Sequence, residues 1–166
     1  MLRHLLNFVS LLVGISTGQA YAAGDLIAPG YGTLDYAVPV AGSYPLPPLG
    51  PAADALVLDS NGKERQLYQL FGERYALLSF MYSSCSDVNG CPLTAHVFYR
   101  LQRAMAENPT LAKSLKLVSL SFDPEHDTPQ AMRLYANNFL HTGAPDQWRF
   151  ATTHNQQQLA PILDAY

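Results

Sequence analysis

Two cysteines are the residues of this chain best suited to chemistry, and they lie close together in the sequence. Cys85 and Cys91 are the only cysteines among the 166 residues. They follow a nearly unbroken apolar run, 75–82, with the length of a buried strand, and Pro92 favours a helix start directly after Cys91. Functional groups collect at the carboxyl ends of strands in α/β sheets, and a helix N-terminus favours a thiolate. We therefore expect both sulfurs to be exposed and activated.

Three roles are open to such a pair: a structural disulfide, a redox couple or a metal site. The turn former Asn89-Gly90 between the cysteines gives enough slack for the Cα separation of about 4.4 to 6.8 Å that a disulfide needs. Closing so short a loop contributes only about 2 kcal/mol, so a purely structural bridge is the weaker interpretation. Two soft thiolates suit Cu(I) far better than Mg²⁺ or Ca²⁺, and the loop lacks the further ligands of a structural zinc site. The pattern favours a redox or copper role.

Strands and helices alternate around this loop. We predict strands over 75–82, 116–122 and 148–151, with the first buried on both faces as a central strand. Between the first two, apolar residues recur every fourth position and predict an amphipathic helix from 92 to about 107, with its inner face formed by Leu93, Val97, Leu101 and Met105. This alternation predicts a three-layer α/β domain with a mostly parallel sheet.

Local capping and turn signals add three further elements. Asn61-Gly62 between two short apolar runs predicts a β-hairpin before the first long strand. Asp127 or Thr128 can cap a helix that has Pro129 at its first position. A last helix begins at about Asn155 and contains Pro161, which kinks it or delays its start.

Composition and the N-terminus narrow the class of protein. The net charge is -3, only 14% of residues are charged, and no run of basic residues supports a nucleic-acid partner. Residues 1–22 have the basic start, apolar core and small cleavage-site residues of a secretory signal, although an uncleaved anchor is the alternative. Residues 23–51 form a Pro/Gly-rich extended arm, and 52–166 form the folded domain. We expect an exported, periplasmic protein without a membrane-spanning mature form.

Three segments together resemble the Sco/SenC family of thioredoxin-fold copper chaperones. They are 78–85 with Cys91-Pro92, the stretch 118–129 that contains Ser-Phe-Asp-Pro, and 148–152. The resemblance, which runs from about residue 45 to the end, implies a thioredoxin-like domain that binds a copper ion through Cys85 and Cys91. It also implies a partner, either the copper-A subunit of cytochrome c oxidase or another copper chaperone, and no small-molecule substrate.

The sequence departs from the family pattern at two places. Family members usually space the cysteines by three residues, whereas five separate them here. The family's third copper ligand is a histidine on a late hairpin, which we expect beyond residue 166, so that the domain would be incomplete at its C-terminal end. None of His96, His126, His141 and His154 matches that ligand, and His96 is expected to be solvated. We expect the Asp123 carboxylate to cap the following turn.

Two other functions remain open from the residues alone. The wider spacing of the cysteines fits a periplasmic thiol-disulfide oxidoreductase that works without metal, so enzyme activity is undecided. A copper sensor or binding module, in which the arm 23–51 engages a partner, is the third interpretation.

Overall fold

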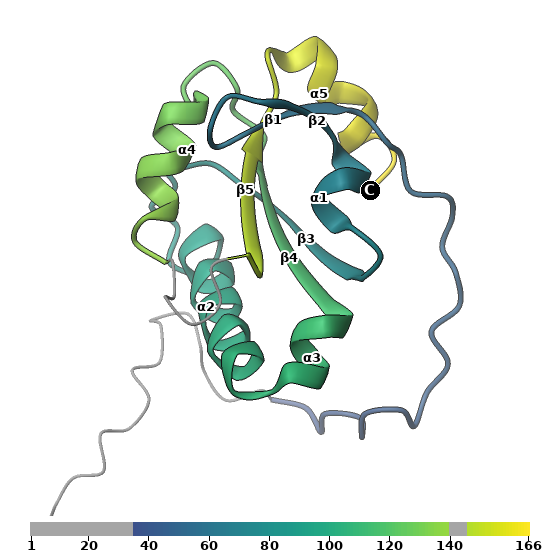
Figure 1. Cartoon of the computed structure of the whole chain (residues 1–166). Helices are drawn as coiled ribbons and strands as arrows, with labels where there is room; N and C mark the ends of the chain where they lie inside the picture. The colour runs from purple at the N-terminus through teal and green to yellow at the C-terminus, as the bar shows by residue number, and fades with distance from the viewer. Residues whose placement is uncertain (1–34, 140–145) are drawn as a thin grey trace, which may run out of the picture.

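The computed structural model describes residues 35–139 and 146–166. The predicted signal sequence, the first part of the arm and His141 lie outside these residues. Residues 35–51 form no helix or strand and have exposed side chains, and Figure 1 shows them as a long strap beside the folded part. Among the helices described, none has the length and apolar character required to cross a bilayer.

The folded part contains one five-stranded sheet and five helices among the described residues. The strands are β1 (Leu56–Asp59), β2 (Glu64–Gln66), β3 (Tyr75–Met81), β4 (Leu115–Ser121) and β5 (Trp148–Thr152). The helices are α1 (Leu67–Phe71), α2 (Cys91–Glu107), α3 (Pro109–Ser114), α4 (Pro129–Ala136) and α5 (Gln156–Leu163). The strand order is β2-β1-β5-β4-β3. Strands β3, β4 and β5 run parallel, whereas β1 is antiparallel to both of its neighbours.

The predicted hairpin forms between β1 and β2. Gly62 takes a positive φ of 79°, which suits glycine because it has no Cβ. The Asp59 carboxylate accepts hydrogen bonds from the backbone N–H groups of Asn61 at 2.9 Å and Lys63 at 3.0 Å. The local sequence signal was therefore sufficient for this element.

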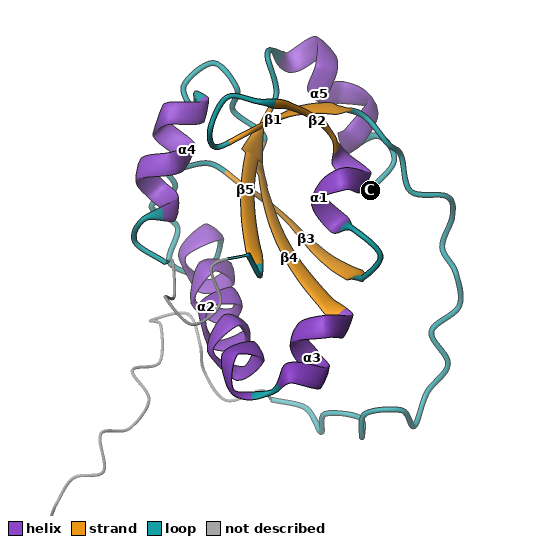
Figure 2. Ribbon diagram, in the orientation of Figure 1, coloured by secondary structure: helices purple, strands orange, loops and turns teal. Residues whose placement is uncertain are grey.

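Helices cover both faces of the sheet, which confirms the three-layer α/β prediction (Figure 2). Alternation along the buried strand β4 sends Leu117 to one face and Val118 and Leu120 to the other. On the Leu117 face, α2 and α4 pack around Trp148, which is 2% exposed and donates from Nε1 to Ser119 Oγ at 3.0 Å. On the other face, α1 and α5 bury apolar side chains against the sheet.

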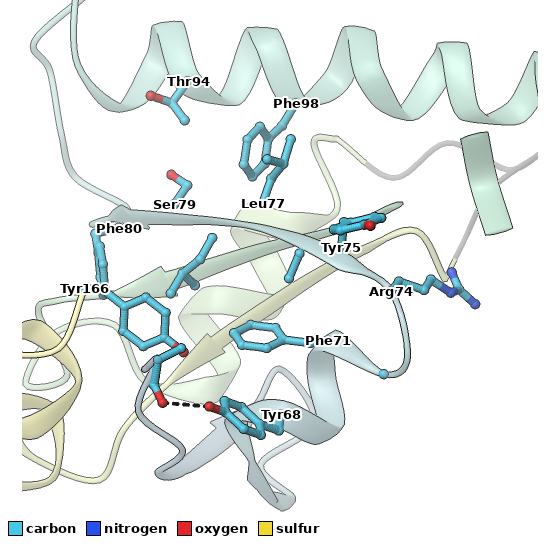
Figure 3. Close-up of a pocket in the computed structure, with 14 residues that line it drawn as sticks. Tyr68, Phe71, Arg74, Tyr75, Leu77, Ser79, Phe80, Thr94, Phe98 and Tyr166 are labelled. Atoms are coloured by element: carbon cyan, nitrogen blue, oxygen red, sulfur yellow. Dashed lines mark hydrogen bonds between the residues drawn. The ribbon is translucent and has the colours of Figure 1, made fainter. Parts of the chain in front are cut away.

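Strand β3 differs from its prediction as a central strand buried on both faces. It pairs with β4 on one side only and forms an edge of the sheet that the described residues build. Tyr75 is 82% exposed and Leu77 is 41% exposed. An apolar groove runs along this edge, and Figure 3 shows aromatic side chains on both sides of the strand, among them Tyr68, Phe71, Phe98 and Tyr166. An apolar run indicates that a strand is hydrophobic, but it does not indicate whether the strand pairs on one side or on both.

The buried face of α2 is also displaced from the predicted one. Of the predicted residues Met105 is buried, whereas Leu93, Val97 and Leu101 are half-buried. The other buried residues of α2 are Ala95, Phe98 and Gln102. Helix α4 is capped by Thr128, whose hydroxyl accepts from the Ala131 N–H at 3.3 Å. Helix α5 has Asn155 as its N-cap and carries Pro161 in its interior. The short helices α1 and α3 were not predicted, because each is too short to show a periodic pattern.

Candidate functional site

The two cysteines lie where the loop after β3 enters α2. Cys85 follows a turn in which its N–H donates to the Tyr82 carbonyl at 3.2 Å. Farther along, the Gly90 N–H donates to the Asp87 carbonyl at 2.9 Å and closes the loop just before the helix. Helix α2 begins at Cys91, with Gly90 as its N-cap and Pro92 in its first turn. The carboxyl end of a strand and the N-terminus of a helix therefore meet at this pair, as the sequence predicted.

Both thiols are free, partly exposed and in mutual contact. The Cys91 thiol donates a hydrogen bond to the Cys85 sulfur, and this bond is the main reason that the pKa of Cys85 lies below that of an ordinary cysteine. The backbone N–H groups of Cys91 and Asp87 and the Tyr82 hydroxyl act in the same direction. Cys85 is thus the thiol that loses its proton more readily.

Cys91 behaves differently from its prediction as an activated thiol. Partial burial against the core cluster under α2 raises the pKa of Cys91, and its hydrogen bond to Cys85 raises it further. Its position in the first turn of α2 does not outweigh these two effects. The pair therefore consists of a thiolate-forming Cys85 and a hydrogen-bond donor, Cys91.

Aromatic side chains surround the pair. Tyr82 packs on Phe122 with the ring centroids 5.0 Å apart, and its hydrogen bond to Cys85 raises the pKa of the Tyr82 hydroxyl. Burial raises the pKa of Tyr135, and electrostatic interaction with the two cysteines and Asp127 raises it further. Tyr135 therefore lies within electrostatic range of the two cysteines and of Asp127.

A buried carboxylate lies beneath the loop. Asp127 is 1% exposed, and it accepts hydrogen bonds from the Ser83 N–H at 2.9 Å and the Ser121 hydroxyl at 2.6 Å. The Ser83 hydroxyl also donates to it. The sequence predicts Asp127 only as a candidate helix cap, so this role was not predicted. Asp127 lies next to the helix cap Thr128, so its position in the sequence indicates capping. Its partner Ser83 lies 44 positions away, and no local pattern connects the two residues.

Two of the described histidines, His126 and His154, pair with carboxylates. His126 Nδ1 is 2.9 Å from the Asp123 carboxylate, and this contact raises the pKa of the His126 ring. The Asp123 carboxylate thus pairs with a side chain, while its backbone carbonyl accepts the N–H of Asp127 at 2.8 Å and forms the turn. His154 Nε2 contacts Glu64 at 2.9 Å, and His96 is half-buried on α2 rather than solvated.

No third group joins the cysteines within the part of the chain that the structure describes. Over residues 35–139 and 146–166, no three side chains of His, Cys, Asp or Glu gather in an arrangement that could hold a metal ion. The role of Cys85 and Cys91 as copper ligands therefore stays a prediction.

The sequence is similar to a known family and to a curated protein. A family model described as SCO1/SenC matches residues 55–166. The SCO1 protein homolog of Bacillus subtilis (strain 168) is 30% identical over 102 residues, which are 61% of this chain and 48% of that protein. The chain thus spans about half the length of this curated relative.

Solved structures share the same architecture. Bradyrhizobium japonicum ScoI with copper bound superposes with a TM-score of 0.56 at 27% identity, over 69% of this chain and 66% of that one. BsSco, a member of the Sco family of cytochrome c oxidase assembly proteins in which a disulfide switch was identified, gives a TM-score of 0.53 at 27% identity, over 69% and 62% of the two chains. The fold is therefore that of the Sco proteins.

Proposed function

The chain belongs to the SCO1/SenC family, and from this premise we propose that it is an exported copper chaperone. Its cargo is a copper ion held by Cys85 and Cys91, and its acceptor is a copper centre of a respiratory oxidase. The contact between the two free thiols at the mouth of α2 is the observation that carries the proposal.

The chemistry of the donor set fits Cu(I). Thiolates are soft ligands, and Cu(I) accepts low coordination numbers, so two sulfurs suffice to hold the ion. Cys85 loses its proton first because Cys91 donates a hydrogen bond to it. Binding of the ion then displaces the proton of Cys91, since the metal replaces that hydrogen bond.

Two properties of the pair suit release as well as binding. Both cysteines are partly exposed, so a thiolate or imidazole of an acceptor can reach the ion and replace the ligands of the chaperone one at a time. Oxidation of the pair to a disulfide removes both thiolates and with them the affinity for copper. The redox state of Cys85 and Cys91 therefore gates delivery, and the acceptor is the copper-A subunit of cytochrome c oxidase or another copper chaperone.

Titration of the reduced protein with Cu(I) tests the proposal. We expect the wild-type protein to bind one ion, and the variant Cys85→Ser/Cys91→Ser to lose at least about a hundredfold in affinity, because hydroxyls are poor ligands for Cu(I). Ser86→Ala, which changes an exposed residue of the same loop, is the matched control and retains the affinity. Equal binding by the double cysteine variant would refute the proposal.

A thiol-disulfide oxidoreductase without metal is the second candidate function. The lowered pKa of Cys85 beside a second thiol favours it, because this pairing of an attacking thiol with a resolving thiol is what disulfide exchange requires. Reduction of a protein disulfide by the metal-free protein, abolished by Cys85→Ser, would support this function. A disulfide with a potential below about −300 mV would exclude it, because so stable a bridge does not cycle.

A further inference from the structure

Asp127 is a buried charged residue to which the proposed function assigns no role. Its side chain lies in the loop between β4 and α4 and is 1% exposed. Burial of a carboxylate costs several kcal/mol unless donors surround it. Here three donors do so: the N–H and the hydroxyl of Ser83, and the hydroxyl of Ser121. The carboxylate therefore joins three segments of the fold.

These segments are the end of β3, the end of β4 and the loop that leads to α4. Ser121 is the last residue of β4, and its hydroxyl oxygen also accepts the N–H of Asp123 at 3.0 Å. Ser83 is the second residue after the end of β3. Through these hydrogen bonds Asp127 holds Ser83, which begins the loop that contains Cys85, against the end of β4.

The two sulfurs are held in place by different parts of the structure. Cys91 is fixed by α2, whose first turn packs on the core. Cys85 lies in a loop with no regular structure, and the bond from its N–H to the Tyr82 carbonyl spans Ser83. The direction of the Cys85 side chain therefore depends on the same turn that the Asp127 carboxylate holds through Ser83.

We propose that Asp127 is a positioning residue, which keeps Cys85 against Cys91 by holding Ser83 through two hydrogen bonds. The inference deepens the proposed function, since a pair that meets only part of the time binds copper more weakly. The inference can also be tested without metal, because the contact between the two thiols sets how readily they form a disulfide.

The equilibrium constant for disulfide formation with glutathione measures how closely the two thiols are held together, and the measurement needs no metal. The dithiol loses two electrons and two protons to oxidised glutathione, which becomes two molecules of reduced glutathione, and the protein gains one disulfide. The equilibrium constant reports the effective concentration of one thiol at the other. Asp127→Asn keeps the size of the side chain but removes its charge and replaces one of its two acceptor oxygens with an NH2 donor. We expect a loss of about tenfold, the effect of one hydrogen bond to a charged group.

Two comparisons separate positioning from a general structural role. Asp123→Asn is the matched control, because it removes the same charge from the same loop at a carboxylate that faces His126 and not Ser83. We expect its equilibrium constant to stay within twofold of wild type. Ser83→Ala removes one of the two bonds, and the double variant Asp127→Asn/Ser83→Ala should lose no more than Asp127→Asn alone. All variants are measured in buffer without denaturant, after circular dichroism has confirmed their fold.

Each outcome decides the inference. An unchanged constant for Asp127→Asn, an equal loss in Asp123→Asn, or additive losses in the double variant would each overturn it. A second measurement, Cu(I) affinity by competition with a chromophoric chelator, should fall by a similar factor in Asp127→Asn. If wild-type protein failed to bind copper, the proposed function would fall, and the glutathione measurement would still decide the role of Asp127.

Discussion

Lys116 occupies a position where its charge costs stability. It lies near the start of β4, is 7% exposed, and donates from Nζ to the Asp146 carbonyl. Burial, with the positive charges of Arg149 and Arg74, lowers the pKa of Lys116 from 10.5 to about 8. Replacement of this side chain by one of similar length without charge should therefore stabilise the protein.

The magnitude follows from the difference between the folded and unfolded pKa. A fall from 10.5 to about 8 corresponds to a cost of about 3 kcal/mol at neutral pH, where the lysine is charged in both states. Loss of the hydrogen bond to the Asp146 carbonyl offsets about 1 kcal/mol of the gain. We expect Lys116→Met to raise the free energy of unfolding by about 2 kcal/mol at pH 7.

The dependence on pH has a definite sign. Between about pH 8 and 10.5 the unfolded chain binds more protons at this lysine than the folded protein, so the stability contributed by Lys116 rises with pH. The cost of its charge falls to about 1 kcal/mol at pH 10. The advantage of Lys116→Met should therefore shrink by about 2 kcal/mol between pH 7 and pH 10.

Urea unfolding in the presence of reductant, followed by the fluorescence of the buried Trp148, measures both quantities. Lys113→Met is the matched control, because it removes an exposed positive charge from the neighbouring helix α3. Its stability should stay within about 0.5 kcal/mol of wild type. A Lys116→Met variant that is no more stable than wild type at pH 7, or whose advantage is constant to pH 10, would refute the reasoning.

Two other outcomes are expected from the site and the core. Iodoacetamide should modify Cys85 at lower pH than Cys91, because the Cys91 thiol lowers the pKa of Cys85 whereas burial raises the pKa of Cys91. Peptide mass spectrometry across a pH series gives the order of modification, and faster reaction of Cys91 would contradict the prediction. Leu120→Ala should lower the free energy of unfolding by about 2 to 5 kcal/mol in urea titrations, since Leu120 is fully buried, while Leu134→Ala, at a 61% exposed position, should change it little.

Much of the fold was predictable because its signals are local. The hairpin depends on the turn at Asn61-Gly62, and α4 depends on the Thr128 cap before Pro129. The apolar run 116–122 predicted a strand, and β4 (Leu115–Ser121) is a strand with buried side chains on both faces. In each case the residues that set the conformation lie within a few positions of one another.

The predictions that were wrong concern the position of β3 in the sheet and the buried face of α2, which both depend on residues distant in the sequence. Strand β3 has the same apolar character as β4, yet within the described residues it has one paired neighbour instead of two. The inner face of α2 depends on how the helix is rotated about its own axis against the sheet, and the buried positions include Ala95 and Phe98. A repeat of apolar residues gives the presence of a helix more accurately than its rotation.

The sequence by itself determined that two cysteines lie between a strand and a helix, in a chain with the motifs of the Sco family. The tertiary structure decided which of them ionises first, because the pKa values of Cys85 and Cys91 depend on burial and on a hydrogen bond between them. It also decided the partner of Asp127, which lies 44 residues from Ser83 in the chain. Strand pairing brings such residues together, and no local pattern records that contact.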